Sequence, residues 1–297
     1  MMRFRPFRRR TGAEGFIVVA VLWILAALAA LVSIYAVYVT NAAVASRIGD
    51  DRLRVEAAIW AGAELTAYQL LGAEPANRPT SGRFKFQLGR AEVSVEFLSE
   101  GARIDLNAAK KEILSGLFSA LGAPPSKSAY YAERVIGWRK KSQSGEQFDE
   151  TTIYRSAGLS YGPRQAPFQD SAELRLVAGL PPDIVEKALP LVTVFNGRAE
   201  IDANVAEATV LSSLPHISPD IVAEILKVRV PTDPRVIQSL LGEARASVAM
   251  ESRKATRAQI HAVLDQGRRV NAELVLLILE DGPEPYRILS WRDDFDG

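Results

Sequence analysis

The sequence predicts an α+β protein in which an N-terminal transmembrane helix continues into a long soluble helix that packs on an antiparallel sheet. Three observations predict this fold. Residues 16–39 form an uncharged apolar run, residues 83–100 and 274–291 show the two-residue alternation of paired strands, and residues 101–270 read mostly as short helices. The helical stretch therefore interrupts the sheet as a large all-helical inserted domain.

The composition is that of an ordinary folded protein, with 48% hydrophobic and 24% charged residues in a chain of 297. Cysteine is absent, which excludes disulfides, thiolate nucleophiles and cysteine-rich zinc sites. Residues 1–15 hold five arginines and one glutamate, so removing them from totals of 36 basic and 35 acidic side chains leaves 31 and 34, a net charge of −3. A slightly acidic body lacks the positive field that attracts phosphate backbones, which argues against a nucleic-acid partner.

The apolar run Phe16–Val39 carries no charge over 24 residues, and at about 1.5 Å per residue a helix of that length spans a bilayer core. The arginines before it predict a cytoplasmic N-terminus, with everything after Thr40 outside. Two alternatives stay open. Ala43-Val-Ala45 resembles a signal-peptide cleavage site, although the apolar run exceeds the usual about 7–15 residues, and the segment also fits a simple uncleaved anchor.

Residues 41–71 are rich in Ala, Leu and Arg, contain no proline and repeat apolar side chains at helical spacing, so the membrane helix is expected to continue into water. Gly72 and Pro75 end it. A hairpin follows at residues 83–100 around Gly89-Arg90, and a second one, Leu274–Leu279 with Tyr286–Trp291, closes the chain. Together the two hairpins predict a four-stranded sheet.

The inserted region contains two similar segments, residues 102–122 and 199–218, which indicate an internal duplication. Each begins with Ile-Asp-x-Asn, and Asn107 or Asn204 is expected to cap the first turn of the helix that follows. The helices expected in this region are Ile113–Leu121, Ser128–Trp138, Glu173–Val177, Asp183–Leu189, Glu207–Leu214, Asp220–Arg229 and Pro234–Leu241.

The N-terminus, a basic leader ending in Gly15 before Phe16 and an apolar helix, resembles the class III leader of type IV pilins and pseudopilins. That resemblance implies cleavage by a prepilin peptidase between Gly15 and Phe16, and methylation of the new N-terminal Phe16. The family usually has glutamate at the fifth mature position, where this chain has Ala20. A membrane carboxylate is costly unless it is paired, and a subunit at the tip of a fibre has no neighbour above to pair with it.

A closer resemblance is carried by several segments in matching order. They are VAVLWILAALAAL in the membrane segment, the two Ile-Asp-x-Asn segments, Pro167-Phe168 with Glu173-Leu174 and Gly179-Leu180, and the ending Pro285–Trp291. Together they resemble the K-type minor pseudopilins of type II secretion systems, which also lack the membrane glutamate.

This resemblance implies a non-enzymatic subunit at the tip of the secretion pseudopilus, which initiates or caps its assembly for export of folded proteins across the outer membrane. Its implied partners are the other minor pseudopilins, the major pseudopilin and the prepilin peptidase. Its implied location is the bacterial inner membrane, crossed once, with the C-terminal region in the periplasm. The expected divisions are a leader at 1–15, a membrane helix at 16–39, a pilin-like helix and hairpin at 40–100, the inserted domain at 101–270 and a final hairpin at 271–297.

Residues 204–229 also resemble a helix-hairpin-helix module, which makes a membrane-anchored DNA-binding protein the alternative function. That module needs glycines where its backbone approaches phosphate, and here His216 and Ser218 take those places. The two histidines, His216 and His261, show no spacing typical of a metal site or a catalytic triad.

One acidic cluster, Glu146, Asp149 and Glu150, lies in a loop-like stretch after Trp138. Carboxylates gathered on a loop suit Ca²⁺, and the resemblance to K-type pseudopilins implies calcium in the helical domain. The chain departs from that family here, because Arg139-Lys140-Lys141 follows the tryptophan where acidic residues are common. Calcium is the only cofactor that the sequence suggests, and a solvated acidic loop is the alternative.

Overall fold

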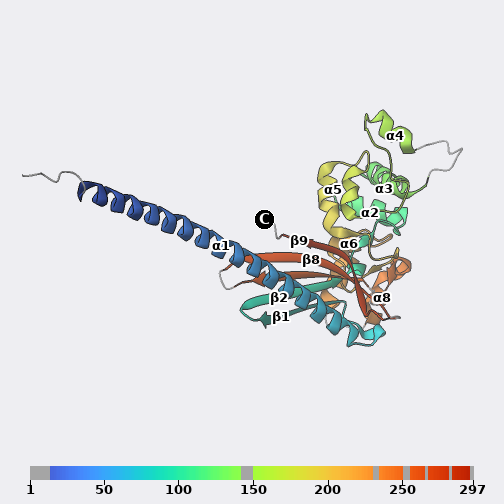
Figure 1. The fold of residues 1–297 in the computed structure, drawn as a ribbon. Coiled ribbons are helices and arrows are strands. Elements are labelled where there is room, and N and C mark those ends of the chain that lie inside the picture. The colour runs from blue at the N-terminus through green and yellow to red at the C-terminus, as the bar shows by residue number, and fades with distance from the viewer. Residues whose placement is uncertain are drawn as a thin grey trace, which may run out of the picture. The chain divides into compact units, whose positions relative to one another are not determined.

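The computed structural model describes residues 14–141, 150–229, 234–249, 255–264, 267–280 and 283–294 (Figure 1). The chain divides into two compact units, Met1–Glu56 and Ala57–Gly297. One helix, α1 (Glu14–Leu71), runs through both, which confirms that the apolar helix continues beyond the membrane segment. It ends where expected, because the N–H of Gly72 closes the last turn on the carbonyl of Tyr68 at 2.9 Å.

Within the second unit, α1 buries one face against a sheet. Ile59, Ala63, Thr66 and Leu70, spaced three or four residues apart, are no more than 1% exposed. Helix and sheet approach closely at Gly62, where a Cβ would lie 2.9 Å from the Cδ1 of Ile260. A larger residue at this position would therefore have to displace the Ile260 side chain.

The sheet has five antiparallel strands in the order β1-β2-β7-β8-β9. The two expected hairpins are present, but the expectation of four strands is wrong. The additional strand, β7, lies inside the range 101–270 that was expected to be all helical, and it pairs the two hairpins through the centre of the sheet. The strands are β1 (Ser81–Leu88), β2 (Ala91–Ser99), β7 (Ala255–Val263), β8 (Arg269–Ile278) and β9 (Tyr286–Asp293).

A β-bulge in β9 decides which of its side chains face α1. Leu276 pairs with Ile288 and Val275 with Ser290, so Leu289 is the extra residue. The bulge places Trp291 opposite Leu274 on the α1 side, where its ring lies 5.0 Å from that of Trp60.

The helical region connects β2 and β7, which are neighbours in the sheet. It leaves after Ser99 and returns at Thr256, which are paired neighbours on β2 and β7, so both of its connections lie at one end of the sheet (Figure 1). Its α-helices are α2 (Lys111–Ala120), α3 (Pro125–Arg139), α4 (Glu150–Ser156), α5 (Pro182–Ala188), α6 (Ala208–Leu211), α7 (Pro219–Val228) and α8 (Pro234–Leu241). The region also contains the short 3₁₀ helices η2 (Glu100–Ala102), η3 (Ser171–Leu176), η4 (Leu189–Leu191) and η5 (Gly242–Ser247), while η1 (Pro75–Asn77) lies before β1. Two-residue strands pair in parallel, β3 (Ile104–Asp105) with β4 (Val192–Thr193) and β5 (Ile201–Asp202) with β6 (Val248–Ala249).

The two Ile-Asp-x-Asn segments have similar structures, but their asparagines do not cap helices. Asn107 instead clamps Phe168, accepting from its N–H at 2.7 Å and donating to its carbonyl at 2.9 Å. The aspartate organises the turn, because Asp105 accepts from the N–H of Asn107 at 2.7 Å and Asp202 from that of Asn204 at 2.9 Å. An aspartate two residues before a backbone N–H forms an Asx-turn, which replaces the expected cap.

In each of the two similar halves, an arginine at an equivalent position donates to a backbone carbonyl just after the Ile-Asp-x-Asn segment. Arg139, at the end of α3, donates to the carbonyl of Ala109 at 2.7 Å, and Arg229, after α7, donates to that of Ala206 at 2.6 Å. These equivalent contacts support the internal duplication. At the packing surface between the two halves, a Cβ on Gly116 of α2 would lie 2.1 Å from the carbonyl oxygen of Ser213.

A turn of one kind recurs three times in this region, once more than the duplication predicts. In each, a residue with positive φ stands three positions before the proline that opens the next helix, and the residues are Gly122 (95°), Gly179 (84°) and His216 (59°) before Pro125, Pro182 and Pro219. His216 therefore adopts a backbone conformation that glycine adopts more readily.

Candidate functional site

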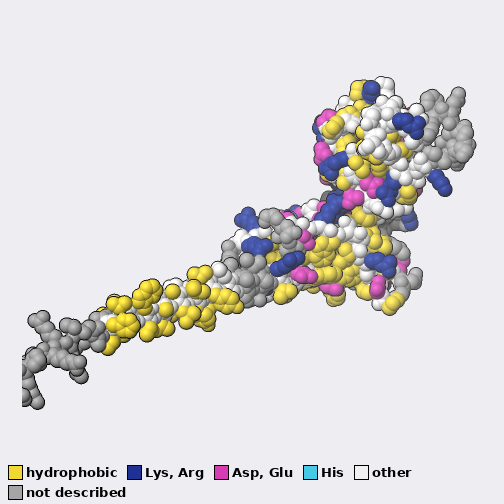
Figure 2. Space-filling model, turned by 45° about the horizontal axis from the view of Figure 1, so that its top comes forward, with side chains coloured by type: hydrophobic (Ala, Val, Ile, Leu, Met, Phe, Trp, Pro, Cys, Tyr) yellow, Lys and Arg dark blue, Asp and Glu magenta, His cyan; other side chains and the backbone are white. Residues whose placement is uncertain are grey.

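The N-terminal helix fits a single-pass membrane anchor by its length and composition. Phe16–Ala43 has a mean hydropathy of 2.9 over its most apolar stretch. Its large apolar side chains are exposed in the described chain, Phe16 by 76%, and they cover this part of α1 (Figure 2). The interior of this protein does not bury that surface, so it needs an apolar environment from elsewhere.

The predicted processing residues lie at the beginning of the same helix. Gly15 and Phe16 are in the first turn of α1, and Ala20 lies about one turn further on. Residues 1–13 are outside the described part of the chain. Leader cleavage therefore remains a prediction.

A row of alternating charges, here called the charge ladder, joins the helical region to the sheet, and the sequence did not predict it. Its members in order are Arg103, Glu100, Arg257, Glu273, Arg292 and Asp170. Its centre is Glu100, whose side chain is fully buried at the start of η2. Glu100 Oε1 accepts from Arg257 Nε at 2.7 Å and from Arg103 Nη1 at 3.2 Å. Its Oε2 accepts from Arg257 Nη2 at 3.2 Å and from the hydroxyl of Thr193.

The charge ladder continues across the sheet on the face opposite α1. Arg257 of β7 also donates to Glu273 of β8 at 2.6 Å. Arg292 of β9 lies 3.9 Å from Glu273 and donates to Asp170 at 2.5 Å. Asp170 in turn caps η3 by accepting from the N–H of Ala172 at 2.8 Å. The charge ladder thus connects three sheet strands to η2 and to η3 of the helical region.

Burial and pairing act in opposite directions on the pKa values of the two innermost arginines. Burial lowers the pKa of Arg257, but bonds to Glu100 and Glu273 outweigh it and the net pKa is raised. For Arg103 burial is stronger than the attraction of Glu100, and Arg257 repels it as well, so its pKa is lowered. The positive charge of Arg103 is therefore less fully balanced by neighbouring carboxylates than that of Arg257.

The pKa of Asp170 is lowered at the other end of the charge ladder. Partial burial opposes its charge, but the N–H of Ala172 and the guanidinium of Arg292 outweigh that cost. Both ends of the charge ladder, Arg103 and Asp170, therefore belong to the helical region, and its sheet residues Arg257, Glu273 and Arg292 lie between them.

The predicted calcium cluster is only partly within the described chain. Glu146 and Asp149 lie outside it. Glu150 is 12% exposed and its Oε2 lies 2.7 Å from Arg134 Nη1. Among the described residues no three His, Asp or Glu side chains gather as metal ligands. Because a calcium ion at Glu150 must compete with the partly buried guanidinium of Arg134, the described part of the cluster fits that ion poorly, and calcium remains an untested prediction.

The two histidines lie apart on the surface. His216 Nδ1 is 3.9 Å from Glu243, and both side chains are highly exposed. His261 Nδ1 lies 2.6 Å from Asn271 Oδ1 on the neighbouring strand. Ser218, which stands where a phosphate-binding hairpin needs glycine, caps α7 by accepting from the N–H of Ile221 at 3.3 Å.

Comparison with known structures identifies the class of fold. The chain is similar to a structure described as "The Crystal Structure of the GspK-GspI-GspJ complex from enterotoxigenic Escherichia coli Type 2 Secretion System", with a TM-score of 0.60 and 17% identity over 82% of this chain and 98% of that one. The long helix packed on an antiparallel sheet with a helical insertion is therefore a fold that this chain shares with that structure.

Residues 94–197, which include η2 and the first of the two similar halves, match the family model described as "Type II secretion system (T2SS), protein K". No curated protein sequence matches the chain. The family match over residues 94–197 and the structural match confirm the resemblance to the K-type minor pseudopilins.

Proposed function

We propose that this protein is a minor pseudopilin at the tip of a type II secretion pseudopilus, where it initiates or caps assembly for the export of folded proteins. The observation that carries the proposal is the position of the helical region. It enters and leaves the sheet through the paired residues Ser99 and Thr256, so a large body is attached at one end of a sheet whose other elements are those of a small pilin-like protein. Such a body is wider than the position of a small subunit within a shaft.

The proposed partners follow from the same fold. The similar structure is a complex of GspK with GspI and GspJ, so two companion minor pseudopilins are the first partners, followed by the major pseudopilin. The proposed location is the bacterial inner membrane, crossed once by Phe16–Ala43, with the N-terminus in the cytoplasm and the folded region in the periplasm. A structural role of this kind requires no catalytic residue.

The absence of a carboxylate at Ala20 is consistent with the tip position. Ala20 is in a helix that has no Asp, Glu, Lys or Arg between Phe16 and Val39. If a membrane carboxylate serves to pair with the N-terminal amine of the subunit above, the first subunit has nothing to pair with, and an unpaired charge there is costly.

The alternative, a DNA-binding module, is supported by the three recurring helical turns. The chain after residue 15 nevertheless has a net charge of −3, and Ser218 is used as a helix cap. Phosphate-backbone binding depends on clustered positive charge. The pseudopilin proposal is therefore preferred.

Leader removal is the first expected result. In cells that contain a prepilin peptidase, mass spectrometry of the purified protein should find Phe16, methylated, as the N-terminal residue. Gly15→Leu should leave residues 1–15 attached, because a bulky side chain blocks access to the scissile bond. Gly12→Leu, a matched substitution away from the junction, should still be cleaved. An N-terminus at Met1 or near residue 46 in the wild-type protein is incompatible with a prepilin leader.

The tip position is tested by the location of the subunit. Gold-labelled full-length protein should be found at one end of each pseudopilus, because the helical region obstructs stacking above it. Replacing residues 101–254 by a short linker should permit longer or more numerous pseudopili and reduce secretion, provided that the shortened chain still binds its companions. Label found repeatedly along the shaft contradicts the tip position even if the leader is removed.

A further inference from the structure

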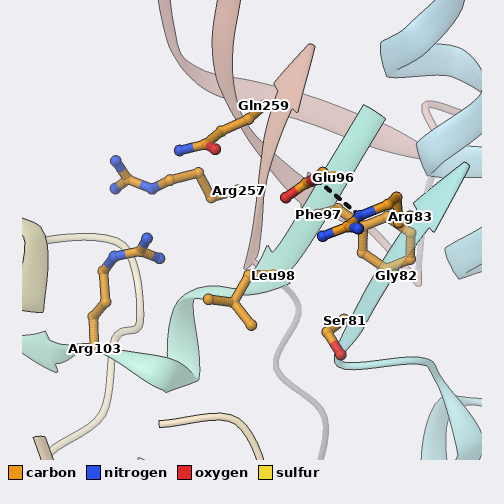
Figure 3. A pocket seen from close by; sticks show the side chains of 9 residues that line it. All are labelled: Ser81, Gly82, Arg83, Glu96, Phe97, Leu98, Arg103, Arg257 and Gln259. Carbon is orange, nitrogen blue, oxygen red and sulfur yellow. Dashed lines mark ion pairs between the residues drawn. The ribbon is translucent and has the colours of Figure 1, made fainter. Parts of the chain in front are cut away.

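A pocket lies beside Arg103, on the face of the sheet that points away from α1 (Figure 3). Its volume is about 580 Å³, within the range of about 300–1,000 Å³ that is usual for ligand sites. The charged side chains that line it are three arginines and one glutamate, Arg83, Arg103, Arg257 and Glu96. The lining is therefore richer in cations than in anions.

Arg103 presents an uncommitted donor in this pocket. Its Nε donates to the carbonyl of Pro190 at 3.1 Å and its Nη1 to Glu100. Within the described ranges, its Nη2 donates to no acceptor. Glu100 does not serve this nitrogen, because its two oxygens already accept four hydrogen bonds from Arg103, Arg257 and Thr193. A second carboxylate is the best acceptor for the remaining N–H groups of a partly buried guanidinium, because charge-assisted hydrogen bonds are stronger than neutral ones.

The rest of the lining is consistent with an anionic ligand. Figure 3 shows Arg103 and Arg257 approaching each other on one side of Leu98, while Arg83 pairs with Glu96 on the other, at 2.8 Å. The Arg83–Glu96 pair is exposed by 71% and 49%, so it is weak and can rearrange when a ligand carboxylate arrives. The amide of Gln259 adds a neutral polar group to the same wall.

The position of the pocket favours a peptide over a free small molecule. Ser81 and Arg83, on its rim, belong to β1, which is an edge strand of the sheet. An edge strand offers backbone hydrogen bonds to an extended segment, and alternate side chains of that segment point the same way. A segment lying along β1 can therefore deliver a carboxylate to the neighbouring arginines.

We propose that this pocket binds an acidic side chain on an extended segment of a partner protein, with the carboxylate held by Arg103 on the side where Arg257 also lies. The proposal does not depend on the function proposed above, because it rests on the charges that line the pocket and on its position beside the edge strand β1.

The test measures binding of a labelled, acetylated and amidated peptide, Ala-Glu-Ala-Glu-Ala, to the full-length protein in detergent micelles by fluorescence anisotropy. The peptide should bind in a salt-sensitive manner, and its Gln counterpart should bind at least about tenfold more weakly because it lacks the charge that Arg103 requires. Free glutarate should compete at least about tenfold less well than the peptide, because it makes no backbone hydrogen bonds to β1.

Two variants with the same added charge locate the binding site. Gln259→Glu places a carboxylate inside the pocket and should weaken peptide binding at least about tenfold, since it occupies the arginines itself. His261→Glu adds the same charge two residues along the same exposed face of β7 but outside the pocket, and should change binding less than about twofold. Arg103→Gln should weaken binding as strongly as Gln259→Glu, with a circular dichroism spectrum that shows the chain folded.

Three outcomes overturn the proposal. They are no peptide binding at low salt, equal losses in Gln259→Glu and His261→Glu, and competition by glutarate as strong as that by the peptide. The last of these assigns the pocket to a small carboxylate ligand.

Discussion

Replacing Glu100 by alanine is expected to destabilise the folded region more than any other single change to its charged side chains, by about 3–5 kcal/mol. Glu100 is fully buried and accepts hydrogen bonds from Arg103, Arg257 and Thr193. Its removal leaves Arg103 without a carboxylate in a setting where its side chain is only 16% exposed. The free-energy cost of leaving a buried charge without a partner is much larger than the stability lost when a surface ion pair is removed.

The measurement is thermal unfolding of the full-length protein in detergent, followed by near-ultraviolet circular dichroism. For a region of this size the expected loss lowers Tm by roughly 10 °C. Glu96→Ala is the matched control, because it also removes a glutamate paired with an arginine, but Glu96 is 49% exposed, and the expected cost is about 0–1 kcal/mol. Similar losses in the two variants contradict the structural role of the charge ladder.

The second large effect is expected from Gly116→Val in α2. A Cβ at this position lies 2.1 Å from the carbonyl oxygen of Ser213 and 2.8 Å from its carbonyl carbon. Both are backbone atoms, so no side-chain rotation relieves the clash, and the two similar halves of the helical region must move apart. We expect a cost of about 3 kcal/mol or more.

The effect of Gly116→Val should be confined to the contact between the two similar halves. Limited proteolysis should cut the second half, residues 199–249, faster than in the wild-type protein, while far-ultraviolet circular dichroism keeps most of its helical signal. Ser119→Ala, on an exposed position of the same helix, should leave the proteolytic pattern unchanged. A Gly116→Val protein as resistant as the wild type contradicts the close contact between α2 and Ser213.

The sequence was most informative where a pattern is long and local. The apolar run with its helical continuation, the turn at Gly89-Arg90 and the main helices of the inserted region were all predicted, and the structure confirms them. Each depends on neighbouring residues only, since hydrophobic periodicity and turn chemistry act within one element. Short elements such as α4 were missed because seven residues, Glu150–Ser156, carry little periodic signal.

Strand β7 was missed for a different reason. Its inward-facing residues are Ala258, Ile260 and Ala262, and alanines give a weak alternation. Alanine is depleted in strands, which are recognised by β-branched and aromatic side chains. The position of β7 is fixed instead by its pairing with β2 and β8, which only the tertiary structure shows.

The sequence by itself determined that this chain has an apolar helix long enough to cross a membrane, a helical insertion and the segments that resemble K-type pseudopilins. Only the tertiary structure decided the order of the five strands, the opposite faces on which Trp291 and Arg292 lie after the β9 bulge, and the charge ladder. Glu100 and Arg257 are 157 positions apart, and neither belongs to a motif. Charges so distant pair only after the chain has folded, because burial and geometry, not sequence spacing, select the partner of a buried ion.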